Sequence, residues 1–239
     1  MTRSSFSMDA NYLFDISQCK FLDRIGKGQY GEVFKVKLHN SNVIYAAKIS
    51  LTNTSEEDIN SMTINLIREV NIISKLIHPA IVKFIGFNTL EIKGDQKSVI
   101  VTEYISKGSL NDQIILERKG IPDPLWDYTK KLITIYGIAS AMSYLHSHKI
   151  IHRDLKPDNI LMDEYLCPKV TDFGLSKILH QNPNSFSLQS MVGFKGTFLY
   201  AAPETIDKNE FTFSGDVYSF SMIAYEIMAN QIPFGGCNY

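Results

Sequence analysis

The sequence predicts an α+β fold of two lobes, a small strand-rich lobe followed by a larger helical one. Three observations lead to this prediction. Residues 19–49 hold short runs in which polar and apolar side chains alternate, as in strands. Residues 110–148 carry apolar side chains at helical spacing, and the pattern changes from strand-like to helix-like near residues 103–107. The 239 residues, 44% hydrophobic and 21% charged, are enough for two such lobes.

The first 18 residues are expected to form a flexible N-terminal extension, because they are largely polar and show no clear period. Residues 19–104 are expected to form the N-terminal lobe. Its predicted strands are residues 21–25, 32–38, 43–49, 81–87 and 98–104. One main helix is expected to begin near residue 54, where small hydroxyl residues precede acidic ones. Apolar residues recur in it at helical spacing, at Ile64, Ile67, Val70 and Ile73 or Ser74.

Residues 105–239 are expected to form the helical lobe, with helices over residues 110–118 and 124–148. The second helix has one apolar stripe, made of Leu132, Ile135, Ile138, Ala139, Met142 and Leu145. The longest apolar run, residues 218–228, contains Glu226 and is shorter than the roughly 18 residues that cross a bilayer. It is interpreted as a buried helix, and no membrane insertion is expected.

The composition argues against several classes of protein. A net charge of -1 gives no support for nucleic acid as a partner. Cys19, Cys167 and Cys237 are too widely spaced for a zinc site and odd in number for a disulfide framework. The N-terminus lacks a secretory signal, and Thr2 excludes the myristoylation pattern. A cytoplasmic location is therefore expected.

A glycine-rich segment lies between the first two predicted strands. Residues 26–33 fit the pattern G-x-G-x-x-G-x-V, whose glycines let backbone N–H groups approach phosphate. In dinucleotide-binding folds the same glycines lead into a helix, whereas here a strand-like run follows. A plain β-turn is the alternative interpretation.

Lys48 lies within an otherwise apolar strand over residues 43–49. An unpaired ammonium there would be costly to desolvate, so it needs an anionic partner. Glu69 on the following helix is one candidate, and a bound phosphate is the other.

Three further motifs follow in the helical lobe. Residues 152–159 read His-Arg-Asp-Leu-Lys-Pro-Asp-Asn, residues 172–174 read Asp-Phe-Gly, and residues 202–204 read Ala-Pro-Glu. With the glycine-rich segment, Lys48 and Glu69, their order and spacing resemble a eukaryotic-type protein kinase domain over roughly residues 19–239.

The resemblance implies a role for each matching residue. Asp154 would accept the proton of the substrate hydroxyl, and Lys156 would lie near the γ-phosphate of ATP. Asn159 and Asp172 would hold Mg²⁺, which prefers oxygen ligands. Lys48, steadied by Glu69, would bind the α- and β-phosphates. The implied cofactors are ATP and Mg²⁺, and the implied partner is a protein substrate.

The resemblance also implies a nucleotide pocket with Thr102 as gatekeeper and residues 103–105 as the hinge whose backbone binds the base. The residues assigned to nucleotide binding are Ile25, Gly26, Gly28, Gly31, Val33, Ala46, Lys48, Thr102, Glu103, Ile105 and Leu161. For the apolar members, a plain core position is the alternative.

Two residues favour serine/threonine specificity, because Lys156 and Thr197 match the pattern of those kinases. Residues 216–223 resemble the corresponding run of tyrosine-kinase-like serine/threonine kinases, with Ser221 in place of a usual glycine. Asp216 would anchor the backbone of the catalytic loop, and a helix N-cap is its alternative role.

Arg153, before the catalytic aspartate, implies control by a phosphate on the activation segment, residues 172–204. Ser185, Ser187 and Ser190 are the candidate acceptors, phosphorylated by an upstream kinase or by autophosphorylation.

The resemblance stops before the last helices of the family's C-terminal lobe, so this lobe is expected to be incomplete and an arginine partner of Glu204 is not found. Two rival functions remain: a nucleotide-binding pseudokinase or scaffold, and a kinase for small molecules. The intact Lys48, Asp154, Asn159 and Asp172 argue against the first rival, and the Ala-Pro-Glu motif argues against the second.

Overall fold

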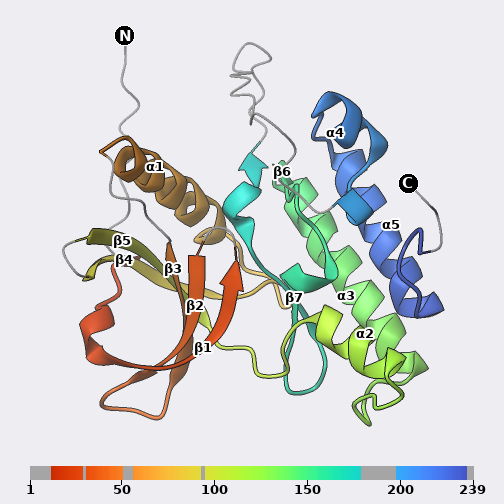
Figure 1. The fold of residues 1–239 in the computed structure, drawn as a ribbon, viewed down its shortest axis with the longest axis horizontal. Coiled ribbons are helices and arrows are strands. Elements are labelled where there is room, and N and C mark those ends of the chain that lie inside the picture. The colour runs from red at the N-terminus through yellow and green to blue at the C-terminus, as the bar shows by residue number, and fades with distance from the viewer. Residues whose placement is uncertain (1–11, 29–30, 51–55, 93–94, 179–197, 236–239) are drawn as a thin grey trace. The chain divides into compact units, whose positions relative to one another are not determined.

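A computed structural model describes residues 12–28, 31–50, 56–92, 95–178 and 198–235 of the protein (Figure 1). These residues form two compact units. The N-terminal unit holds the described residues up to Ile77 together with Val82–Tyr104. The C-terminal unit holds His78–Ile81 and the described residues from Ile105 onward. The first unit is mainly a sheet and the second mainly helices, which confirms the predicted α+β class.

The N-terminal unit is built on a five-stranded antiparallel sheet with the strand order β1-β2-β3-β5-β4. The strands are β1 (Cys19–Gly28), β2 (Gly31–Leu38), β3 (Ile44–Ser50), β4 (Phe84–Ile92) and β5 (Asp95–Glu103). One helix, α1 (Glu56–Ile73), belongs to the same unit (Figure 1). The fourth strand begins three residues later than predicted, and its pairing with β5 shows a register shift between Phe84 and Gly86.

Each face of this sheet carries its own apolar cluster. On one face, Ala47 and Val101 are fully buried. The cluster there consists of Ile16, Cys19, Val36, Ala47, Ile49, Val99 and Val101. On the other face, Leu66 and Val70 of α1 pack with Phe87 and Ile100 of the sheet. Of the stripe predicted on the helix, Val70 makes this contact, whereas Ile64 is 56% exposed and Leu66, which was not predicted, packs on the sheet one turn before Val70.

The predicted flexible extension is wrong for residues 12–18, while residues 1–11 lie outside the described part. Ile16–Gln18 form a 3-10 helix capped by Asp15, whose side chain accepts a hydrogen bond from the backbone of Ser17. Ile16 is only 4% exposed. The physical reason is that Tyr12, Phe14 and Ile16 supply enough apolar surface to order this short stretch.

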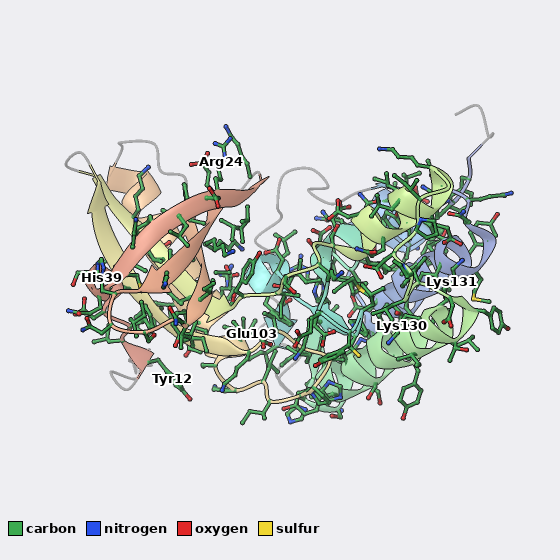
Figure 2. The ribbon with its side chains drawn as sticks, turned by 90° about the horizontal axis from the view of Figure 1, so that it is seen from below. Tyr12, Arg24, His39, Glu103, Lys130 and Lys131 are labelled. Carbon is green, nitrogen blue, oxygen red and sulfur yellow. The ribbon has the colours of Figure 1, made fainter. Side chains whose placement is uncertain are left out.

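The C-terminal unit is organised around two long helices that pack on each other, α3 and α5. Its helices are α2 (Leu110–Arg118), α3 (Tyr128–Ser147), α4 (Pro203–Lys208) and α5 (Phe213–Ala229). Its short strands are β6 (Ile150–Ile151), β7 (Ile160–Met162), β8 (Pro168–Val170) and β9 (Lys177–Ile178). Figure 2 labels Lys130 and Lys131 near the start of α3.

Side-chain caps mark the starts of α2 and α3 in this unit. Asp127 caps α3 by accepting from the backbone N–H of Lys130, so the helix starts four residues after the predicted start at 124. Ser109 and Asp112 form a reciprocal capping box at the start of α2. Ile138 and Leu145, from the predicted stripe of α3, are fully buried.

The run over residues 218–228 is a helix, as predicted, and lies within α5, but it is buried on one side only, since Tyr225 is 47% and Met228 41% exposed. Glu226 interrupts the apolar run but is only 2% exposed. Its two carboxylate oxygens accept from Tyr200 Oη at 2.6 Å and from Arg118 Nη2 at 2.8 Å. Burial, and then the hydrogen bond to Glu226, raise the pKa of Tyr200, which therefore stays a protonated donor at neutral pH.

Among the described residues, no helix combines the length and the apolar composition that a membrane crossing requires. Cys19 and Cys167 are free thiols, as expected, and burial raises the pKa of the Cys19 thiol. Cys237 lies outside the described residues.

Candidate active site

The loop between β6 and β7 gathers three of the predicted site residues around one carboxylate. Lys156 Nζ lies 2.9 Å from Asp154 Oδ2. The side-chain amide of Asn159 donates to the same oxygen at 3.0 Å and to the backbone carbonyl of Asp154 at 2.8 Å. Both side chains of the ion pair are mostly buried, with exposed fractions of 21% for Lys156 and 10% for Asp154. The loop therefore holds a carboxylate and an ammonium in fixed positions.

Asp216 of α5 anchors the backbone of this loop. Its carboxylate accepts from the backbone N–H of His152 at 2.8 Å and from that of Arg153 at 3.0 Å. The residue is only 3% exposed, and His146 Nε2 lies 2.9 Å from the same carboxylate. The anchoring role is confirmed. The alternative prediction, that Asp216 is a helix N-cap, is wrong, because Thr212 is the N-cap of α5.

Two non-glycine residues of the site have left-handed backbones, Arg153 with φ 73° and Asp172 with φ 63°. Such conformations cost on the order of 1–3 kcal/mol each and gather at functional sites. The hydrogen bond from the Arg153 backbone to Asp216 is one of the contacts that hold the strained loop. The guanidinium of Arg153 also stacks on the ring of Phe211, 3.8 Å from its centroid.

The backbone links Asp172 to the loop through its neighbour Thr171. The N–H of Thr171 donates to the carbonyl of Asn159 at 3.0 Å, and the Thr171 carbonyl lies 3.1 Å from His152 Nε2. Phe173, fully buried, packs its ring against that of His152. Asp172 and Asn159 are therefore held on neighbouring backbone segments.

These two residues fit the chemistry of Mg²⁺. Because the amide nitrogen of Asn159 is committed to Asp154, its side-chain oxygen is the atom left to act as a ligand. Asp172 adds a carboxylate, and Mg²⁺ commonly takes one or two protein oxygens together with water and phosphate oxygens. Within the described part of the chain, no group of three or more His, Cys, Asp or Glu is placed to hold a metal.

In the N-terminal unit, the amine of Lys48 on β3 donates to Glu69 of α1 at 3.0 Å. The two side chains are 25% and 14% exposed. The predicted pairing of Lys48 with Glu69 is confirmed, and a phosphate as a further partner stays a prediction.

The sheet register explains how several nucleotide-site residues come together. Val33 pairs with Lys48, and Ala46 pairs with Thr102. Paired residues share a face, as do residues two apart on one strand, so all four lie on one face. Ile100, which pairs with Lys48, packs against α1 on that same face. The register therefore aims Lys48 toward the helix that carries Glu69.

The glycines of the glycine-rich segment, residues 26–33, serve different purposes. A Cβ added at Gly31 would collide with the backbone carbonyl oxygen of Ile49, so the packing of β2 on β3 requires that glycine. A Cβ at Gly26 would meet only Val33 Cβ at 3.5 Å, an ordinary contact. Gly28 pairs directly with Gly31, and the two residues between them lie outside the described part. At Gly26 the chain's own packing leaves the glycine unexplained.

The remaining predicted nucleotide residues lie on separate elements. Ile25 is on β1 and 46% exposed. The N–H of Glu103 donates to the Lys83 carbonyl at 3.0 Å, and contact of Glu103 with the base stays a prediction. Ile105 follows at the start of the C-terminal unit, and Leu161 is half-buried on β7. Ser185, Ser187, Ser190 and Thr197 lie outside the described residues.

Three contacts of the loop had no signal in the sequence motifs. These are the Phe211 ring on Arg153, the His146 imidazole on Asp216, and the hydrogen bond from Asn111 Nδ2 to Asp158 Oδ1 at 2.9 Å. Each joins residues far apart in the chain, so only the fold reveals it.

Comparison with known proteins gives one consistent result. The model of the protein kinase domain family matches residues 19–238. The chain is 35% identical over 229 residues to the serine/threonine-protein kinase CTR1 of Arabidopsis thaliana, covering 94% of this chain and 26% of that protein.

Two other relatives give similar figures. Identity is 33% over 230 residues to the serine/threonine-protein kinase TNNI3K of Rattus norvegicus, covering 95% of this chain and 26% of that protein. It is 34% over 213 residues to an Aurora kinase of Debaryomyces hansenii, covering 88% of this chain and 47% of that protein. The chain thus spans about a quarter to a half of the length of these relatives. With its catalytic loop, its Lys48–Glu69 pair and this match, the chain belongs to the protein kinase domain family.

Proposed function

We propose that this chain is a serine/threonine protein kinase that transfers the γ-phosphoryl group of ATP to a serine or threonine hydroxyl of a protein. The observation that carries the proposal is the cluster of Asp154, Lys156 and Asn159, in which a mostly buried carboxylate is held by an ammonium and an amide. Phosphoryl transfer needs little covalent chemistry from the protein and depends on positioning and on charge stabilisation. This cluster supplies both.

In the proposed reaction, the substrate hydroxyl donates a hydrogen bond to the carboxylate of Asp154, which orients its oxygen toward the γ-phosphorus. A bond forms between that oxygen and phosphorus, and the bond from phosphorus to the β,γ-bridging oxygen breaks. The hydroxyl proton passes to Asp154, and ADP leaves with the bridging oxygen. The ammonium of Lys156, 2.9 Å from Asp154, stabilises the negative charge on the transferring group.

The nucleotide is proposed to bind through the residues that match the family's nucleotide-binding positions. Lys48, fixed by Glu69, binds the α- and β-phosphates, and Gly26 with Gly28 lets the backbone approach them. The adenine contacts the apolar side chains and the hinge backbone. The residues assigned to it are Ile25, Val33, Ala46, Thr102, Glu103, Ile105 and Leu161. Mg²⁺, held by Asn159 and Asp172, would neutralise phosphate charge when it is bound.

Serine/threonine specificity is supported by Lys156 and Thr197, and by two relatives that are named serine/threonine-protein kinases, CTR1 and TNNI3K. Residues 216–223 support placement among tyrosine-kinase-like serine/threonine kinases. A cytoplasmic location suits an enzyme that consumes ATP. The net charge of -1 gives no support for a nucleic acid partner.

Control by phosphorylation is a further part of the proposal. Arg153 sits beside the catalytic aspartate with a strained backbone. A phosphate on Ser185, Ser187 or Ser190, added by an upstream kinase or by the chain itself, would pair with its guanidinium. Replacing all three serines by alanine is expected to leave a poorly active enzyme, and unchanged turnover would exclude them.

The test is incubation with γ-labelled ATP, Mg²⁺ and a generic protein substrate, followed by phosphoamino acid analysis, with Asp154→Asn in parallel. We expect label on serine or threonine from the parent chain and little from the variant. Label on tyrosine alone would contradict the specificity. No transfer by the parent, with nucleotide still bound in an equilibrium assay, would favour the nucleotide-binding scaffold.

A further inference from the structure

Residues 12–16, here named the strap, run along the free edge of the N-terminal sheet. Leu13 forms a parallel bridge with Phe87 of the edge strand β4. The N–H of Phe14 donates to the Phe87 carbonyl at 2.9 Å, and the side-chain amide of Asn88 donates to the Phe14 carbonyl at 2.6 Å. The strap therefore binds β4 as a short additional strand, which covers an otherwise open edge.

The strap contacts the apolar clusters on both faces of the sheet. Tyr12 packs against the cluster of Leu66, Val70, Phe87 and Ile100, which attaches α1 to the sheet. Phe14 and Ile16 belong with the opposite cluster, and the Phe14 ring meets that of Tyr45 edge-on at 5.5 Å. Five residues thus join the two cores around one edge. Tyr12 is labelled in Figure 2.

Tyr12 also reaches the end of α1. Its hydroxyl donates to the backbone carbonyl of Ser74, the residue after the helix, at 3.4 Å. Its ring packs edge-on against Phe84 at 5.4 Å. Carbonyl groups at a helix C-terminus lack partners within the helix, so a donor at this position stabilises the end of α1. The contact links the strap to the helix that carries Glu69.

Gly86 shows that the sheet is shaped to receive the strap. A Cβ added there would lie 2.7 Å from the Tyr12 carbonyl oxygen and 2.8 Å from Phe14 Cβ. The φ angle of Gly86 does not lie in the left-handed region, so the backbone conformation at this position does not require a glycine. The close approach of the strap does.

We propose that the strap is a positioning element for Glu69. When docked, it holds α1 against the sheet through Tyr12, one turn beyond the Val70 contact, and so favours the Lys48–Glu69 pair. When released, α1 loses its contact at Ser74 and part of its cluster, and the pair forms less often. This inference rests on the proposed function, since Glu69 matters for turnover only if Lys48 binds ATP phosphates.

The first experiment is hydrogen–deuterium exchange over residues 66–76 in the parent, Tyr12→Ala and Gly86→Ala. The matched control is Leu13→Ala, which shortens a side chain of the strap that is 60% exposed and keeps its backbone bonds. We expect exchange to quicken roughly 2- to 10-fold in both test variants, the range for loss of one edge-to-face aromatic pair. Exchange no faster than in Leu13→Ala would overturn the proposal. Thermal unfolding verifies that each variant folds.

The second experiment asks whether the strap acts through Glu69. Tyr12→Ala is measured in the parent and in a Glu69→Gln background, with kcat and KM for ATP determined separately. We expect kcat/KM to fall several-fold in the parent and to change little further in the Glu69→Gln background. An equal fold-loss in both backgrounds would overturn the positioning role and leave only a structural one.

The two experiments keep this inference separate from the proposed function. Hydrogen exchange requires no catalysis. If the parent chain transfers no phosphate, faster exchange in Tyr12→Ala and Gly86→Ala still supports the link from the strap to α1. Unchanged exchange still overturns it.

Discussion

Lys156 Nζ and Asp154 Oδ2 lie 2.9 Å apart, and the amide of Asn159 donates to the same oxygen at 3.0 Å. One oxygen of the carboxylate is therefore held by two donors. Its orientation is set before any substrate binds, which is how a site reduces the reorganisation needed in the transition state. In the proposed reaction, the ammonium would stabilise the charge on the transferring phosphoryl group and the carboxylate would receive the proton of the substrate hydroxyl.

The Lys48–Glu69 pair is expected to act as a unit in nucleotide binding. Lys48→Met should weaken ATP use strongly, because it removes the cation that binds the phosphates. Glu69→Gln should raise KM for ATP and lower kcat, because the amine at 3.0 Å loses its charged partner. In the double variant the losses should be far from additive, as for residues in one ion pair. Steady-state kinetics on all four proteins measures this coupling, and fully additive losses would contradict it.

Thr212 and Asp216 lie at the two ends of the first turn of α5, and their replacement should have different effects. Loss of Thr212 should lower stability alone, whereas loss of Asp216 should lower both stability and activity. Thr212→Ala removes an N-cap and should lower the free energy of unfolding by about 0.5–2 kcal/mol, with turnover per folded molecule unchanged. Asp216→Ala leaves the N–H groups of His152 and Arg153 without their acceptor, which costs about 1–3 kcal/mol for each buried group.

Asp216→Ala should therefore lower stability and also disorder the loop that carries Asp154. Chemical denaturation together with turnover at a permissive temperature measures both effects. A variant that folds less stably but retains full turnover would show that Asp216 does not position the catalytic loop.

Gly31 and Gly26 should respond differently to alanine. In Gly31→Ala the new Cβ meets the Ile49 carbonyl, so the apparent melting temperature should fall without any ligand. In Gly26→Ala the Cβ has room in the sheet, so stability should hardly change while affinity for ATP falls. Thermal unfolding with and without ATP and Mg²⁺ distinguishes them. Equal destabilisation of the two unliganded variants would refute the assignment.

The motifs of the sequence identified the catalytic loop and the Lys48–Glu69 pair because this chemistry requires particular residue types at close spacing. The sequence motifs also assigned Val33, Ala46 and Thr102 to the same site as Lys48, but they could not show what brings these side chains together. That came from the strand register, which puts them on one face of the sheet with α1.

The strap was missed for a physical reason. Tyr12, Phe14 and Ile16 alternate with Leu13 and Asp15 in a stretch too short to give a periodic signal. Its order depends on Gly86 and Phe87, more than 70 positions later, and nothing local reveals that contact. The left-handed backbone of Arg153 was likewise hidden, because the bond that helps to hold it comes from Asp216.

The central claim is that Asp154 orients the substrate hydroxyl and receives its proton, and the loop offers its own control in Asp158. That carboxylate lies four residues on, is exposed, and accepts from Asn111 rather than from Lys156. The most direct measurement is single-turnover phosphoryl transfer with γ-labelled ATP by Asp154→Asn and Asp158→Asn. Transfer should fall roughly 10²–10⁴-fold in Asp154→Asn, the usual contribution of general acid–base catalysis, and stay near the parent rate in Asp158→Asn. Equal rates in the two variants would contradict the account.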